Sequence, residues 1–235
     1  MNQRYYSLDV FRGATVAFMI LVNNPGSWAN IYAPLDHATW HGCTPTDLVF
    51  PFFLFAVGNA MAFVMPRFQE KGTGYFLRKI IKRTLLIFGI GLFLNWCPFV
   101  QWKDDQLIFK VWANIRIFGV LQRIAICYFF ASLIIYFFKI RGALVITGII
   151  LFGYWLLCYA FGSKDDPYSL EGYFGTAIDK TVLGINHMYK GEGAAFDPEG
   201  IASTLPAIVQ VIFDILQVSI FVRKEKRGRC YHTLL

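Results

Sequence analysis

The chain has 235 residues, of which 56% are hydrophobic, 18% aromatic and only 16% charged. This composition excludes an ordinary soluble domain and indicates a membrane protein. The formal net charge of +7 would suggest nucleic acid or another anionic partner in a soluble protein, but Lys and Arg concentrate in the cytoplasmic loops of membrane proteins. We therefore expect no nucleic-acid partner.

Six apolar stretches are long enough, or nearly long enough, to cross a bilayer, which requires about 20 helical residues. They are residues 8–22, 48–65, 80–96, 117–138, 143–161 and 201–222. The sequence therefore predicts an all-α fold, a multi-pass transmembrane helix bundle with about six membrane helices in one domain over residues 1–222. Residues 223–235 are rich in Lys and Arg and are expected to form a basic cytoplasmic tail.

The charges between these stretches predict the orientation. Basic residues gather between the second and third stretches (residues 66–83) and again at Lys139 and Arg141, which indicates cytoplasmic loops. The loop of residues 23–47 has no Lys or Arg, and residues 162–200 are mainly acidic, so both are expected on the opposite side. We expect a protein of the cell inner (cytoplasmic) membrane with its N-terminus in the cytoplasm.

Two segments show the signals of helix starts. Residues 44–47 (TPTD) combine a capping hydroxyl, a proline at the first helical position and an acid three residues after the cap. Residues 197–200 (DPEG) are expected to open the sixth helix in a similar way. The five cysteines show neither CxxC pairing nor metal-ligand spacing, so we expect no metal site.

Polar residues between the first two stretches are the leading candidates for chemistry. An imidazole titrates near neutral pH, so His37 could take a proton from an amine or hydroxyl nucleophile. Asp47 would orient or charge-balance that imidazole, and Asn23 or Asn24 could donate to a developing oxyanion. The alternative is a solvated loop histidine, an aspartate that only caps its helix, and an ordinary turn at residues 23–26.

Arg116 and Arg123 are seven residues apart in the fourth stretch, which would place both on one helix face about 10 Å apart along the axis. A charge within a membrane helix costs about 2.5–3.5 kcal/mol and normally faces a polar cavity or a partner. Arginine forks suit phosphate, so this face is a candidate anchor for a phosphorylated cofactor. Arg116 alone could instead extend to the outer interface.

Seven short motifs follow one another between roughly residues 5 and 210. They are residues 7–13 (SLDVFRG), 22–23 (VN), 37–40 (HATW), 46–51 (TDLVFP), 116–123 (RIFGVLQR), 186–189 (NHMY) and 197–200 (DPEG). Together they resemble the heparan-alpha-glucosaminide N-acetyltransferase family and its bacterial relatives in the transmembrane acyltransferase superfamily.

The resemblance implies an acyltransferase that moves acetyl from cytoplasmic acetyl-CoA, its co-substrate, to the amine of a glucosamine-containing saccharide on the far side of the bilayer. It implies that His37 is the catalytic histidine and that Asn23 and Asp47 are its active-site companions. It also implies contact with the cofactor for three residues of one motif: Arg116, Gln122 and Arg123.

Members of that family continue for several more membrane helices, whereas this chain ends in a basic stretch and residues 230–235 (CYHTLL). We therefore expect a chain truncated relative to the family, and an inactive fragment is one alternative. Another is an amino-sugar transporter or permease component, but it would predict an internal repeat and short or broken helix pairs, which we do not find. The sequence leaves open the acceptor sugar, whether acetyl rests on His37 or passes directly to the acceptor, and a homo-oligomeric state.

Overall fold

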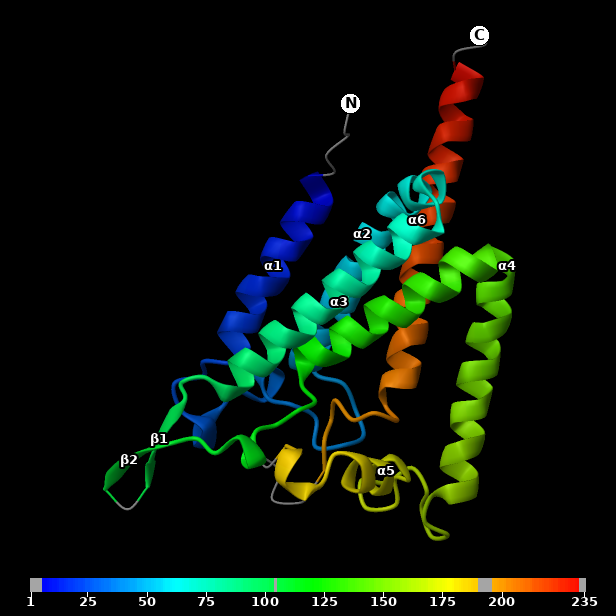
Figure 1. Cartoon of the computed structure of the whole chain (residues 1–235). Helices are drawn as coiled ribbons and strands as arrows, with labels where there is room; N and C mark the ends of the chain where they lie inside the picture. Colours follow the sequence, from blue (N-terminus) through cyan, green and yellow to red (C-terminus); the bar gives the residue numbers. More distant parts are fainter. Residues whose placement is uncertain (1–5, 104, 190–195, 233–235) are drawn as a thin grey trace. The chain divides into compact units, whose positions relative to one another are not determined.

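The computed structural model describes residues 6–103, 105–189 and 196–232. For Lys103 and residues 221–232 it describes the backbone only. The basic tail predicted at residues 223–235 thus lies outside the described side chains. The chain divides into two compact units, Met1–Arg67 with Gln210–Leu235 and Phe68–Val209. Figure 1 shows the elements of both.

The first unit contains long helices joined by a loop with three 3-10 helices. Its elements are α1 (Tyr6–Val22), η1 (Trp28–Asn30), η2 (Ala33–Leu35), η3 (Thr46–Leu48), most of α2 (Val49–Lys71) and most of α6 (Thr204–His232).

Aromatic and glycine contacts hold these helices together. Phe11 of α1 packs edge-on against Phe52 and Phe55 of α2, with ring centroids 5.5 and 5.2 Å apart, a favourable aromatic geometry. A side chain at Gly58 would lie 2.4 Å from the Cβ of Asp214. Helices α2 and α6 therefore approach each other closely because position 58 is a glycine.

The second unit contains two long helices, a hairpin and a short helix. Its elements are α3 (Thr73–Trp96), β1 (Val100–Lys103), β2 (Gln106–Phe109), η4 (Trp112–Asn114), α4 (Val120–Phe161), α5 (Gly175–Val182) and η5 (Ile185–His187). The two strands pair antiparallel, with Trp102 opposite Leu107.

Helix α3 packs against the first half of α4. Near one end, the ring of Phe76 stacks on Tyr136 with centroids 3.9 Å apart. Near the other, a Cβ at Gly91 would lie 2.7 Å from Oε1 of Gln122, so the absence of a side chain at Gly91 allows the close approach.

Helix α4 is 42 residues long and is interrupted at Lys139, where φ is 55° and ψ is −167°. This conformation is not helical and is rare for lysine. The backbone therefore changes direction at Lys139. Figure 1 shows the two halves of α4 joined by a sharp bend. Gly142 follows the bend and leaves room for Phe138, whose Cβ would lie 2.7 Å from a side chain at position 142.

The mostly helical fold predicted from the sequence is confirmed. The first three apolar stretches match α1, α2 and α3, the fourth and fifth match the halves of α4, and the sixth matches α6. By length and hydropathy, Thr46–Lys71 and Val120–Phe161 are candidate membrane spans. A six-pass bundle stays a prediction.

Four predictions about local structure were wrong. The all-α assignment missed the β1–β2 hairpin, and the supposed loop of residues 162–200 contains α5. The fourth helix begins at Val120, so Arg116 precedes it. The sixth helix begins at Thr204, and the carboxylate of Asp197 binds Arg116 and the backbone N–H groups of Tyr189 and Glu199.

Candidate active site

His37 and Asp47 form a hydrogen-bonded pair in the first unit. Nδ1 of His37 lies 2.7 Å from Oδ1 of Asp47. A carboxylate only accepts hydrogen bonds, so Nδ1 carries the proton and the neutral ring presents the lone pair of Nε2. The imidazole is 66% exposed, and Nε2 has no hydrogen-bond partner among the described residues. The pair therefore has the arrangement of an oriented general base.

The local sequence holds Asp47 in place. Its other oxygen, Oδ2, accepts bonds from the backbone N–H groups of Thr44 and Ala38, at 2.8 and 3.2 Å, and from the Thr44 hydroxyl at 3.0 Å. The bond from the Thr44 N–H is the one that a capping acid makes. The sequence suggested two roles for Asp47, capping its helix and orienting His37. Its hydrogen bonds fit both roles.

Neighbouring residues fix the backbone around the histidine. Asp36 accepts the backbone N–H of His37 at 2.9 Å, and its carbonyl accepts the Thr44 hydroxyl at 2.6 Å. These bonds tie the two ends of the loop together, eight residues apart. The position of the imidazole is therefore determined by backbone bonds as well as by Asp47.

Among the described residues, no hydrogen bond joins Asn23 or Asn24 to this pair. The side-chain amide of Asn23 donates to the carbonyl of Met19 at 2.9 Å, and that of Asn24 donates to Ile20 at 2.7 Å. Both amides thus close the last turn of α1. A role for Asn23 in the reaction stays a prediction and would require its amide to leave Met19.

In the second unit, Arg116 binds two acidic residues that lie more than 80 positions further along the chain. Its Nε donates to Oδ2 of Asp197 at 3.1 Å and its Nη2 to Oδ1 at 2.5 Å. Nη2 also donates to Glu199, and the Tyr189 ring lies 4.8 Å from the guanidinium carbon. Burial alone would lower the pKa of Arg116, but the bonds to Asp197 and the charge of Glu199 raise it.

Arg123 binds the same segment from α4. Its Nη1 donates to the carbonyl of Pro198 and its Nη2 to that of Ser203, each at 2.7 Å. Arg116 precedes α4, so the prediction that both arginines lie on one helix face was wrong. They nevertheless share neighbours, which are residues 197–203. We call this stretch the clamped segment.

Gln122 is buried in the contact between α3 and α4. Its side chain is 1% exposed, and its Nε2 has no hydrogen-bond partner among the described residues. Leaving a buried amide donor without a partner costs free energy. Contact between Gln122 and the cofactor stays a prediction.

Sequence reasoning missed Asp179 as part of this region. It is fully buried, and its Oδ1 accepts the backbone N–H of Ile201 in the clamped segment at 2.8 Å. Burial raises the pKa of Asp179 to about 6. A carboxylate among apolar residues of α5 was the available signal. Asp197 and Glu199 were noticed as helix-start residues and as part of the DPEG motif, but not as partners of Arg116.

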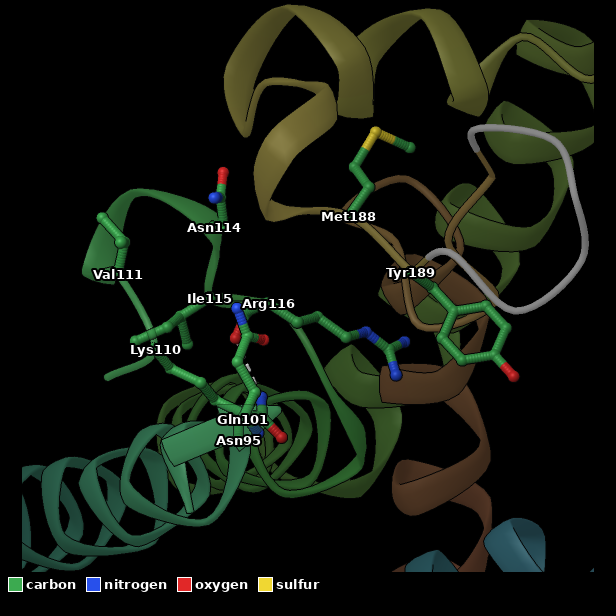
Figure 2. A pocket seen from close by; sticks show the side chains of 9 residues that line it. All are labelled: Asn95, Gln101, Lys110, Val111, Asn114, Ile115, Arg116, Met188 and Tyr189. Carbon is green, nitrogen blue, oxygen red and sulfur yellow. Dashed lines mark hydrogen bonds between the residues drawn. The ribbon is translucent and has the colours of Figure 1, made fainter. Parts of the chain in front are cut away.

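A cavity of about 500 Å³ adjoins Arg116 in the second unit. Its nine lining residues are Asn95, Gln101, Lys110, Val111, Asn114, Ile115, Arg116, Met188 and Tyr189. Figure 2 shows Asn114, Met188 and Arg116 bordering one open space. No group of His, Cys, Asp and Glu residues suited to a metal ion occurs in the described part of the chain.

The apolar helices and the carboxylate-held histidine define a helical protein with candidate membrane spans and a candidate general base. The chain belongs to the heparan-alpha-glucosaminide N-acetyltransferase family, because the sequence model "Heparan-alpha-glucosaminide N-acetyltransferase, catalytic" matches residues 4–170. The resemblance seen in the motifs is thereby confirmed.

Two curated relatives are similar at low identity. The human heparan-alpha-glucosaminide N-acetyltransferase is 28% identical over 96% of this chain and 40% of its own length. The mouse enzyme of the same name is 27% identical over 93% of this chain and 39% of its own length. The chain therefore spans about two fifths of the length of these relatives.

Proposed function

We propose that this chain carries the acetyl-transfer site of a membrane acetyltransferase, which moves acetyl from acetyl-CoA to the amine of a glucosamine-type saccharide. The observation that carries the proposal is the 2.7 Å bond between His37 and Asp47, in a chain that belongs to a family of N-acetyltransferases.

In the proposed reaction His37 acts as the base. Nε2 takes a proton from the acceptor amine as the amine nitrogen attacks the thioester carbonyl of acetyl-CoA. A C–N bond forms, the C–S bond breaks, and CoA leaves as a thiolate. Asp47 stabilises the imidazolium that results. The proton on His37 then neutralises the thiolate. General-base assistance of this kind contributes about 10²–10⁴ in rate.

We further propose that Arg116, Gln122 and Arg123 contact acetyl-CoA. For Gln122 the support is the motif resemblance alone, because its side chain is 1% exposed and a ligand could reach it only if α3 and α4 separated. In Arg116, Nε and Nη2 bind Asp197 and Glu199. Its Nη1 has no hydrogen-bond partner among the described residues and could donate to a ligand. Arginine donors of this kind suit the phosphates of CoA.

The proposed location is the inner membrane, with the N-terminus in the cytoplasm and the saccharide on the other side. One support is the exposed apolar surface of both halves of α4, where Phe137 is 52% and Ile149 is 65% exposed. Another is one face of the hairpin, formed by Val100, Trp102, Leu107 and Phe109. We call it the apolar hairpin face.

The exposure of that face fits a lipid neighbour. Trp102 is 76%, Leu107 57% and Phe109 78% exposed, and the register places Trp102 opposite Leu107 and Val100 opposite Phe109. Exposed aromatic residues gather at the interface between membrane and water. The hairpin precedes the candidate span of α4 by about ten residues, so we place it at the outer interface.

The test uses membranes that contain the chain, labelled acetyl-CoA and glucosamine. We expect acetylated sugar to form, His37→Ala to abolish it, and His41→Ala to leave it unchanged. His41 is a suitable control because it is an exposed histidine of the same loop. Both variants should be present at equal amounts by immunoblot.

Two outcomes would favour the other functions. Sugar uptake that does not depend on CoA would indicate a transporter. Activity in a full-length relative, but none in this chain at equal abundance, would indicate that this stretch alone is inactive.

A further inference from the structure

We propose that the beginning of α3 binds the headgroup of an anionic phospholipid, with an acyl chain of the same lipid lying along the exposed side of this helix. The proposal rests on the membrane location proposed above and not on acetyl transfer. Helix α3 (Thr73–Trp96) lies wholly in the second unit, and Figure 1 shows it as one continuous helix. Positions along its surface therefore follow the regular helical period.

Positive charges without acidic partners gather at the beginning of α3. Four exposed cations, which we call the basic cluster, are Lys71, Arg78, Lys79 and Lys82. None of them forms an ion pair with a described residue, and Glu70 is the only acid between residues 68 and 103. Arg78 and Lys82 are four residues apart, a spacing at which like charges destabilise a helix. A bound anion would relieve this repulsion.

Tyr75 holds two members of the basic cluster close together. The ammonium of Lys71 lies 4.7 Å from the centroid of the Tyr75 ring, and that of Lys79 lies 5.6 Å from it, both within the range of cation–π contacts. Arg83 is instead directed toward α4, because its guanidinium carbon lies 5.8 Å from the centroid of the Tyr128 ring. The Tyr75 ring gathers two positive charges without neutralising them, which favours a negatively charged ligand such as a phosphate.

An exposed apolar row continues from the basic cluster along α3. Positions 78, 82, 85, 89 and 93 are three or four residues apart and so share one helix face. After the two cations the row consists of Leu85, Gly89 and Phe93, and the side chains of Leu85 and Phe93 are 66% and 56% exposed. Nothing lies within 4 Å of a Cβ at Gly89, so the row is open there to a chain of methylene groups.

The length of the apolar row fits one leaflet of a bilayer. From Lys82 to Phe93 the helix rises about 16 Å, and half of a hydrocarbon core of about 30 Å is about 15 Å. A lipid whose phosphate contacts Arg78 and Lys82 therefore has an acyl chain that can extend to Phe93. A soluble phosphate compound would occupy the cations and leave the apolar row uncovered, so the two surfaces together favour a lipid.

The test counts lipids bound to the whole chain by native mass spectrometry. The purified chain is mixed in detergent with equal amounts of phosphatidylglycerol and phosphatidylcholine that carry the same acyl chains. Each basic residue beside an anionic lipid strengthens its binding severalfold. We therefore expect wild type to bind phosphatidylglycerol about tenfold more tightly than phosphatidylcholine.

The double variant Arg78→Gln, Lys82→Gln should lose most of this preference. Lys164→Gln, Lys180→Gln is the matched control, because it removes two exposed cations of the same unit that lie outside α3, and it should keep the preference. Leu85→Ser should weaken the binding of phosphatidylglycerol severalfold, whereas Leu144→Ser, at a 48% exposed position of α4, should not. All variants should elute like wild type in size-exclusion chromatography.

Competition separates a lipid site from a site for soluble phosphates. Glycerol phosphate, which has no acyl chain, and CoA should not displace the bound phosphatidylglycerol. Displacement by either compound, equal binding of the two lipids by wild type, or an unchanged preference in Arg78→Gln, Lys82→Gln would each overturn the proposal. Equal binding of the two lipids would leave the membrane location standing, whereas binding of neither would contradict that location as well. The assay contains no acetyl acceptor, so its result does not depend on acetyl transfer.

Discussion

His37 and Asp47 are joined by a 2.7 Å bond between Nδ1 and Oδ1, so one carboxylate sets both the proton position and the direction of the imidazole. In Asp47→Asn, an amide can donate to Nδ1 and so favour the opposite tautomer, in which Nε2 is protonated and cannot act as a base. We expect acetyl transfer to fall by about 10²–10⁴, measured with labelled acetyl-CoA.

Asp36→Asn is the control for this change. Asp36 bonds the backbone of His37 and an asparagine oxygen can accept the same N–H, so its activity should stay within twofold of wild type. Equal activity of the two variants would contradict a role for Asp47 beyond helix capping.

Arg116→Gln should destabilise the folded chain. The side chain of Asp197 is 0% exposed, and without Arg116 its charge would be buried without its main partner. Breaking such a pair costs about 3–5 kcal/mol, which we would measure as a lower thermal midpoint in detergent. The double variant Arg116→Gln, Asp197→Asn should recover part of the loss, whereas Arg141→Gln at an exposed position should have little effect. Failure of the double variant to recover any stability would contradict the pairing.

Asp179 should make stability depend on pH. Its pKa is raised from 3.8 to about 6 by burial, so between these values the folded chain binds more protons than the unfolded chain. The free energy of unfolding therefore falls as pH rises through this window and levels off above it, by about 2–3 kcal/mol in total. Asp179→Asn should remove this fall and be more stable than wild type at pH 7 but not at pH 4.

Thermal midpoints between pH 4 and pH 7.5 would measure the difference. Asp165→Asn, at an exposed loop position, should follow the wild-type curve. Parallel curves for wild type and Asp179→Asn would show that Asp179 does not titrate in this window.

Gly91 and Gly89 should respond oppositely to alanine. A Cβ at Gly91 would lie 2.9 Å from the Cβ of Leu121 as well as close to Gln122, whereas nothing lies within 4 Å of one at Gly89. Gly91→Ala should therefore cost about 1–3 kcal/mol through overpacking. Gly89→Ala should be neutral or stabilising by up to about 1 kcal/mol. Thermal midpoints of the two variants test this contact, and equal midpoints would contradict it.

The apolar hairpin face can be tested with spin labels. Leu107 belongs to that face, and its neighbour Gln106 points to the other side of the same strand. A label at Leu107→Cys in nanodiscs should be more accessible to lipid-soluble oxygen, and one at Gln106→Cys to a water-soluble nickel chelate. A Leu107 label that is as accessible to nickel as the Gln106 label would exclude lipid contact.

The helices and the histidine site were largely predictable because their signals are local. Long apolar runs set the helices, and Thr44, Asp47 and His37 lie within eleven positions of one another. The β1–β2 hairpin was not predicted, because each strand has only four residues, β2 does not alternate between apolar and polar residues, and β2 is mostly exposed. The partners of Arg116 were also missed, because 81 positions separate it from Asp197 and no local pattern links them.

That separation has a consequence for biosynthesis. Chains are made at about 5–20 residues per second, so Asp197 leaves the ribosome about 4–16 seconds after Arg116. During this delay both halves of α4 (Val120–Phe161) are synthesised, while the guanidinium still has neither of its acidic partners. The clamped segment, and with it the cavity beside Arg116, is therefore completed late in assembly, after the long helices of the same unit.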